Sequence, residues 1–129
     1  MTRSHSRRHF DALVVAATRG ELSWVSDVEV LKDMTIGGAR TLFVVSGPGV
    51  ANVSYMLGKV LAVARPSLIL CVGIGGAYRS SGLVEGDVAV ATAEYDADWG
   101  VETPSPEDRG RLSVPRLIHE GSEFHESFP

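Results

Sequence analysis

A short apolar run that ends in a cluster of glycines constrains this chain more than any other feature. Residues 68–72 (LILCV) are apolar over the length of one strand, and glycine follows at positions 73, 75 and 76. Because glycine has no Cβ atom, the backbone at such a turn can approach another group closely. Ligands of open α/β sheets bind at the carboxyl ends of strands, so the pattern predicts an α/β fold with a ligand site at this turn.

The rest of the chain alternates between strand and helix patterns. We expect strands at 11–17, 28–32, 41–46, 67–74 and 87–94, a short helix at 21–26 and a longer helix at 49–64. The first strand should be buried on both faces, because residues 12–17 are continuously apolar. The next two strands flank Gly37 and Gly38, which predicts an antiparallel hairpin. The long helix has apolar residues three and four positions apart, with Arg65 in its last turn and Pro66 enforcing its end.

Composition indicates one small globular segment. Hydrophobic residues make up 44% of the chain and charged residues 22%, as in ordinary soluble domains. With a net charge of −4 and basic residues that share no predicted face, we expect no nucleic-acid binding. The apolar runs are far shorter than the roughly 20 residues of a membrane helix, so we expect no span. We expect a disordered tail at 1–9, a folded part at 10–102, and a loop or tail at 103–129.

Cys71 is the one cysteine of the chain. A single cysteine excludes an internal disulfide framework and fits a reducing cytoplasm. Its place in the middle of an apolar run predicts a small core residue rather than a nucleophile.

Four short segments follow one another in a defined order. They are VVAATRGE at 14–21, SGPGVANV at 46–53, VGIGGA at 72–77, and GDV at 86–88 followed by YDAD at 95–98. In that order they resemble the nucleoside phosphorylase and nucleosidase superfamily over residues 10–102, and ADWGVE at 97–102 is most similar to its futalosine hydrolase branch. The resemblance implies a three-layer α/β fold with a central mixed sheet, present here only as its amino-terminal half.

The resemblance also implies an activity. Such enzymes cleave the N-ribosidic bond of a purine nucleoside without a cofactor. The resemblance implies that the substrate is futalosine, in menaquinone biosynthesis in the cytoplasm. It also implies a homo-oligomer, and we expect a dimer. The family's second half supplies a ribose-binding glutamate and a purine-binding aspartate, in motifs that this chain does not contain. We therefore expect little activity from the isolated chain.

Glu21 is the candidate catalytic residue, because it follows the first strand directly. By resemblance it activates the water that attacks the sugar, and a carboxylate suits this task because cleavage builds oxocarbenium-like positive charge. From its position alone, an exposed glutamate that the dipole of a short helix favours is the better interpretation, and the resemblance is what favours the catalytic one. The catalytic hypothesis requires Glu21 to face the same sheet edge as the Gly73 turn.

The remaining candidate binding residues come from the resemblance. Pro48 and Gly49 would border the 5′ side of the sugar, Ile74, Gly75 and Gly76 would line the ribose and base, and Trp99 would reach the pocket of a neighbouring subunit. Alternatively, the glycines are simply tight strand exits. Neither glycine turn fits a dinucleotide fingerprint, because Asn52 and Tyr78 occupy the third glycine position.

The residues at the turn favour water over phosphate as the nucleophile. Cys71 and Ile74 stand where phosphorolytic relatives carry an arginine and a serine. An apolar pair would leave a buried phosphate dianion without partners, which is unfavourable by many kcal/mol. Arg19 and Arg40 are the nearby candidates for an unusual anion contact.

A cluster of acidic residues at the end of the region that resembles the family could be considered as a metal site. Its members are Glu94, Asp96, Asp98 and Glu102. They have no histidine at ligand spacing, and alternate strand residues point to opposite faces, so we expect no metal. His119 and His125 receive no role.

Two other functions remain open. A truncated, non-catalytic homologue would act as a binding or assembly module, because half a sheet exposes an edge and a face. A nucleotide-binding α/β domain of different ancestry would bind phosphate groups instead.

Overall fold

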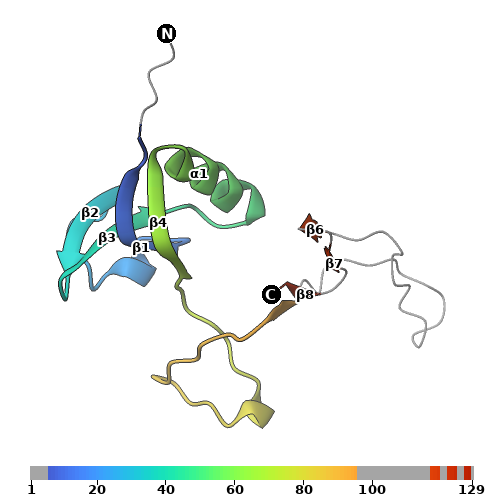
Figure 1. Ribbon diagram of the computed structural model, residues 1–129. Helices are drawn as coiled ribbons and strands as arrows, with labels where there is room; N and C mark the ends of the chain where they lie inside the picture. The colour runs from blue at the N-terminus through green and yellow to red at the C-terminus, as the bar shows by residue number, and fades with distance from the viewer. Residues whose placement is uncertain (1–5, 96–116, 120–121, 125–126, 129) are drawn as a thin grey trace. The chain divides into compact units, whose positions relative to one another are not determined.

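The computed structural model describes residues 6–95, 117–119, 122–124 and 127–128 (Figure 1). The chain divides into two units, Met1–Ala77 and Tyr78–Pro129. The first unit is an α/β structure with one mixed sheet and one α-helix. Its elements are β1 (Arg8–Ala16), the 3-10 helix η1 (Gly20–Leu22), β2 (Leu31–Ile36), β3 (Ala39–Val45), α1 (Val50–Val63) and β4 (Ala64–Cys71).

The sheet has the strand order β2-β3-β1-β4. β1 pairs in parallel with both β3 and β4, so the carboxyl ends of these three strands lie at one edge. β2 and β3 form the expected antiparallel hairpin, with Gly37 and Gly38 at φ values of 57° and 87° that favour glycine. β2 begins later than the predicted strand at 28–32, because Val28 is buried beneath the sheet instead of pairing within it.

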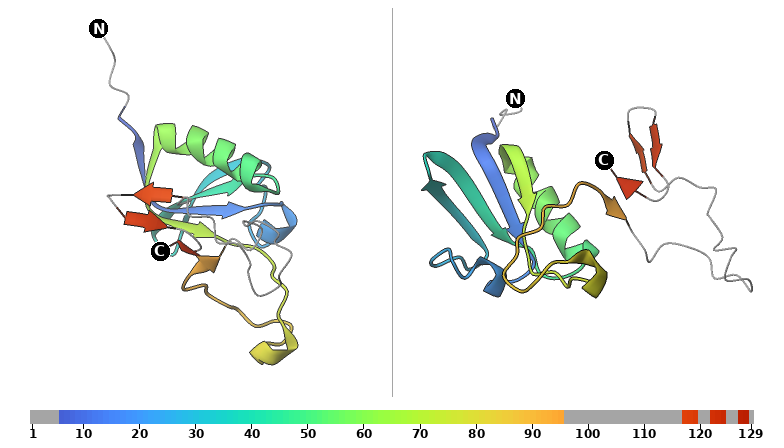
Figure 2. Two further views of the ribbon diagram at one scale, coloured as in Figure 1. Left: turned by 90° about the vertical axis from the view of Figure 1, so that its right-hand side faces the viewer. Right: turned by 90° about the horizontal axis from the view of Figure 1, so that it is seen from below.

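Both faces of β1 are buried, as its apolar run predicted. One face packs under α1, in a cluster of Phe10, Leu13, Val15, Leu42, Val44, Val60 and Ala64. The other face carries Val14, Ala16, Leu22, Val25, Val28 and Phe43. Figure 2 shows α1 along one face of the sheet, whereas the second face is covered by the segment that contains η1. The described residues therefore form an α/β structure that has an α-helix on one face of the sheet and no second helical layer.

The helix α1 was predicted within one residue at each end. Arg65, however, lies in β4 and not in the last helical turn. The reason is Pro66, whose ring disfavours the helical conformation of the preceding residue. The backbone is already extended one residue earlier, at Ala64.

β4 lies at the edge of the sheet rather than in its interior. Leu68, Ile69 and Leu70 are 51%, 45% and 43% exposed. Cys71 is also exposed, so its prediction as a core residue was wrong. An apolar run indicates a strand but cannot distinguish a central strand from an edge strand, since burial depends on neighbours from elsewhere in the chain.

Where the second unit is described, its elements are short. They are the 3-10 helix η2 (Arg79–Ser81), β5 (Glu94–Tyr95), β6 (Leu117–His119), β7 (Ser122–Phe124) and β8 (Ser127–Phe128). β5 pairs with β8, and β6 with β7, each time antiparallel. The predicted strand at 87–94 was wrong over most of its length, because Val88 and Val90 are 89% and 86% exposed and lie outside any described strand.

The predicted boundaries of the two tails also differ from the structure. Arg8 and His9 belong to β1, so the folded part begins earlier than residue 10. The region 103–129, expected as loop or tail, contains β6, β7 and β8 where it is described. Within the described part of the chain, none of the helices has the length and apolar character needed to cross a bilayer.

Candidate functional site

The carboxyl ends of the three parallel strands, β1, β3 and β4, lie side by side at the same end of the sheet. Backbone hydrogen bonds join them: Ser46 N–H to Ala16 O at 2.9 Å, Gly47 N–H to Ala17 O at 3.0 Å, and Val72 N–H to Val15 O at 2.9 Å. Segments far apart in the sequence are thereby held side by side. This is the edge at which ligands of α/β sheets usually bind.

Glu21 connects the exit of β1 with the exit of β4. Its Oε2 accepts hydrogen bonds from the Thr18 N–H at 2.7 Å and from the Thr18 hydroxyl at 3.0 Å. Its Oε1 accepts a longer one, 3.4 Å, from the Ile74 N–H. The expectation that Glu21 faces the same edge as the Gly73 turn is therefore confirmed.

Gly73 makes this approach possible. A Cβ atom at position 73 would lie 2.8 Å from Glu21 Oε1, which is too close for an undisturbed carboxylate. At Gly75 and Gly76, in contrast, an added Cβ would meet nothing within 4 Å. The first glycine of the turn is thus required for close contact with Glu21, and the other two leave open space next to it.

Hydrogen bonding keeps the Glu21 carboxylate charged. The N–H of Thr18, followed by the Thr18 hydroxyl, lowers the pKa of Glu21 below its ordinary value of 4.5. Partial burial opposes this shift, and the Ile74 N–H adds to it. The Ala17 N–H lowers the pKa further, and because all of these donors stabilise the anion, Glu21 is ionised at neutral pH.

Thr18 is the residue of this site that the sequence prediction missed. Thr18 and Glu21 have the spacing of a capping box, in which a glutamate reaches back to the N–H three residues earlier. The T-x-x-E pattern at 18–21 was the available signal. It explains why Glu21 folds back toward the strand exit instead of extending into solvent.

Pro48 and Gly49 lie between β3 and the start of α1. The Asn52 amide donates a 2.6 Å hydrogen bond to the Pro48 carbonyl, which closes this loop on the first turn of the helix. No hydrogen bond between described residues joins Pro48 or Gly49 to Glu21. The structure thus places them at the same sheet edge, through the bonds of Ser46 and Gly47, but not in contact with the carboxylate.

The turn at Ile74, Gly75 and Gly76 is open to solvent. Ile74 is 92% exposed, so a sugar placed there would be only partly enclosed by this unit. Trp99, the remaining predicted binding residue, lies outside the described residues, as do Asp96, Asp98, Glu102 and His125. Of the acidic group, Glu94 alone is described, in β5, and His119 lies in β6.

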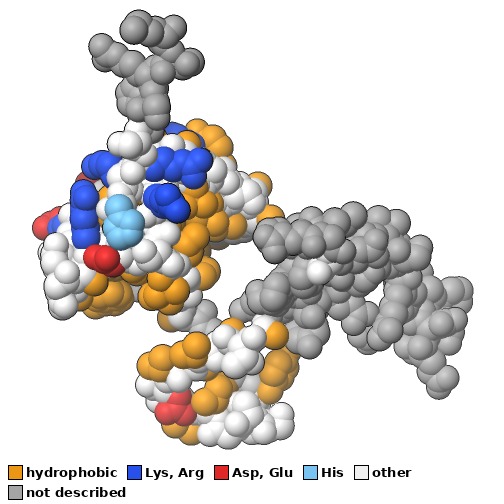
Figure 3. Space-filling view, viewed as in Figure 1, with side chains coloured by type: hydrophobic (Ala, Val, Ile, Leu, Met, Phe, Trp, Pro, Cys, Tyr) orange, Lys and Arg blue, Asp and Glu red, His pale blue; other side chains and the backbone are white. Residues whose placement is uncertain are grey.

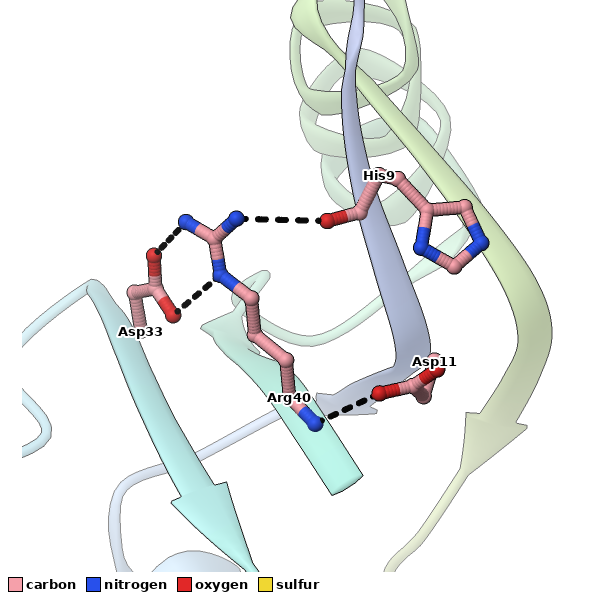
Figure 4. Close-up of polar contacts among 4 residues, drawn as sticks. All are labelled: His9, Asp11, Asp33 and Arg40. Atoms are coloured by element: carbon pink, nitrogen blue, oxygen red, sulfur yellow. Dashed lines mark hydrogen bonds and ion pairs between the residues drawn. The ribbon is translucent and has the colours of Figure 1, made fainter. Parts of the chain in front are cut away.

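Arg40 does not belong to this site. It lies near the start of β3, at the opposite end of the sheet, and pairs with Asp33 through Nη2 at 2.6 Å (Figure 4). Its backbone N–H also donates to Asp11 at 2.7 Å, and its guanidinium lies 4.5 Å from the centre of the Phe10 ring. The prediction that Arg40 is close enough for an anion contact was wrong, because the strand direction separates it from Glu21. Arg19 donates to the Glu29 carbonyl at 3.0 Å.

Basic side chains gather at the end of the sheet opposite Glu21. Figure 3 shows Lys and Arg side chains with one histidine grouped there. The register of β1 with β4 places His9 beside Arg65, two residues far apart in the sequence. The sequence did not predict this group, because its members lie on different strands whose pairing brings them together.

Comparison with protein-family models, with curated proteins and with solved structures gave no match.

Proposed function

We propose that this chain carries the water-activating part of a nucleosidase that hydrolyses the N-ribosidic bond of a purine nucleoside, with futalosine as the substrate suggested by the sequence resemblance. One observation supports the proposal above the others. The ionised carboxylate of Glu21 lies against Gly73, at the edge where three parallel strands end. A carboxylate beside an open glycine turn suits a reaction that needs a base and a negative charge near a sugar.

The chemistry follows from the atoms available. The bond between C1′ and the base nitrogen breaks, its electron pair leaves with the base, and positive charge develops on the sugar. Water adds to C1′ and loses a proton, which the Glu21 carboxylate accepts. The leaving base must also gain a proton, and we assign that step to no described residue.

The residues at this turn suit water as the nucleophile better than phosphate. Cys71 and Ile74 are not cationic residues, Arg40 is held by Asp33 at the far end of the sheet, and Arg19 donates to the Glu29 carbonyl. A phosphate dianion beside these residues would lack compensating donors.

The open turn limits the activity expected of this chain. A general base alone contributes about 10² to 10⁴ in rate, and much of the remaining acceleration of such enzymes comes from holding the substrate in place. With Ile74 92% exposed, the sugar is not enclosed by the described residues. We expect slow or undetectable turnover but measurable nucleoside binding at the turn.

The test combines turnover with binding. Futalosine, methylthioadenosine and inosine are incubated with the full chain, base release is followed by chromatography, and the backbone amides of residues 72–76 are monitored by NMR. Glu21→Gln should abolish any base release, while Glu29→Gln, in the adjacent loop, should not. If no nucleoside shifts the turn amides and Glu21→Gln changes neither readout, the proposal fails.

A non-catalytic role in assembly is the second candidate. It is favoured by β4, whose apolar residues are exposed at the sheet edge. Edge strands of this kind pair with other chains.

A further inference from the structure

We infer that Thr18 is a positioning residue, which holds Oε2 of the Glu21 carboxylate and leaves Oε1 as the oxygen that receives a proton. The role of Oε1 rests on the proposed function. The placement of the carboxylate does not, and it can be tested without catalysis.

The two oxygens of Glu21 have different surroundings. Oε2 accepts two short hydrogen bonds, at 2.7 Å and 3.0 Å, both from Thr18. A carboxylate oxygen has two lone pairs, so Oε2 has no further acceptor capacity. Among the described residues, Oε1 accepts one hydrogen bond, from the Ile74 N–H at 3.4 Å, which is longer than a normal N–H···O bond and leaves this oxygen more weakly held than Oε2.

Thr18 is itself held in place by the sheet. The residue before it, Ala17, accepts a hydrogen bond from the Gly47 N–H at 3.0 Å, and Ala16 is buried. Both donors of Thr18 therefore start from a fixed backbone. Donors fixed before reaction need no reorganisation during it, which is the condition for effective electrostatic positioning.

Oε1 points toward the glycine turn rather than into the protein. It lies where the side chain of residue 73 would begin, and no described residue comes within 4 Å of the position that a Cβ of Gly75 or Gly76 would take. A water bound to Oε1 would thus lie beside the surface that is open to a ligand. Oε2, which faces the β1 exit, could not reach that position while it is bonded to Thr18.

The test measures the pKa of Glu21 by carboxyl carbon NMR in the full chain and in two variants. Thr18→Val keeps the backbone donor and the branched shape but removes the hydroxyl, so the pKa of Glu21 should rise. Thr18→Ser restores a hydroxyl and should return the pKa to its wild-type value. A purely structural role of Thr18 would not produce this rescue, because serine lacks the methyl group that valine retains.

A second measurement covers the case in which Thr18→Val fails to fold. In the wild-type chain, the amide protons of Thr18 and Ile74 should shift with pH at the midpoint of Glu21, and these transitions should vanish in Glu21→Gln. The inference is overturned if Thr18→Val leaves the pKa of Glu21 unchanged, or if neither amide follows Glu21. That outcome is distinct from failure of the proposed function, which is decided by nucleoside binding and base release.

Discussion

At the scale of single residues, Glu21 and Gly73 depend on each other. A Cβ atom at position 73 would lie 2.8 Å from Glu21 Oε1. Gly73→Ala should therefore move the Glu21 carboxylate away from the Ile74 N–H without removing the carboxylate itself. We expect weaker nucleoside binding and a changed Ile74 amide shift. Gly58→Ala is the matched control, since its Cβ would also meet nothing within 4 Å and the residue lies in α1, outside the turn. Equal effects of the two variants on the Ile74 amide would contradict this account.

The hydrogen bonds of Glu21 also make stability depend on pH. The pKa of Glu21 is lower in the folded chain than its ordinary value of 4.5, mainly because of the Thr18 N–H. Its stabilising contribution is therefore present above that ordinary value and is lost as the pH falls through the folded pKa. Urea midpoints of the wild type and Glu21→Gln, measured from neutral to acidic pH, should differ most at neutral pH and converge in acid. A difference that stays constant over this range would exclude the effect.

At the scale of elements, α1 is anchored to the sheet through Val60. This residue is 3% exposed, whereas Val63 in the same helix is 57% exposed. Val60→Ala should lower the free energy of unfolding by about 2 kcal/mol, from two lost methyl groups and the cavity they leave. Val63→Ala should change it by less than about 0.5 kcal/mol. Denaturant unfolding of the two variants checks the contrast, and equal losses would mean that α1 does not pack through this face.

The two edge strands differ in how they resist pairing with another chain. β2 carries Lys32 and Asp33 in its centre, but residues 67–71 of β4 contain no charge and no proline. Charged side chains and proline are common protections of sheet edges, so β4 is protected at Arg65 and Pro66 but not over residues 67–71.

At the scale of the whole molecule, this difference predicts self-association through β4. Ile69→Lys should shift the chain toward the monomer in light scattering, because a charge in the centre of the strand opposes edge pairing. Leu31→Lys is the matched control on β2, since Leu31 and Ile69 are 48% and 45% exposed. A wild-type chain that stays monomeric at high concentration would refute the prediction.

The sequence by itself determined those features that depend on neighbouring residues. The hairpin at Gly37 and Gly38 follows from the φ values that glycine allows, and the extent of α1 follows from apolar spacing and from Pro66, all of which are local properties. The T-x-x-E pattern at 18–21 likewise indicates the hydrogen bonds by which the Glu21 side chain folds back to Thr18.

Only the tertiary structure decided which remote segments meet. It placed Gly73 against Glu21, moved Arg40 to the far end of the sheet, and exposed Cys71 on an edge strand. The physical reason is that strand order and direction set the neighbours of each residue, and these are determined by the packing of the whole sheet. An apolar or charged residue has the same letter in the sequence whichever neighbour it receives.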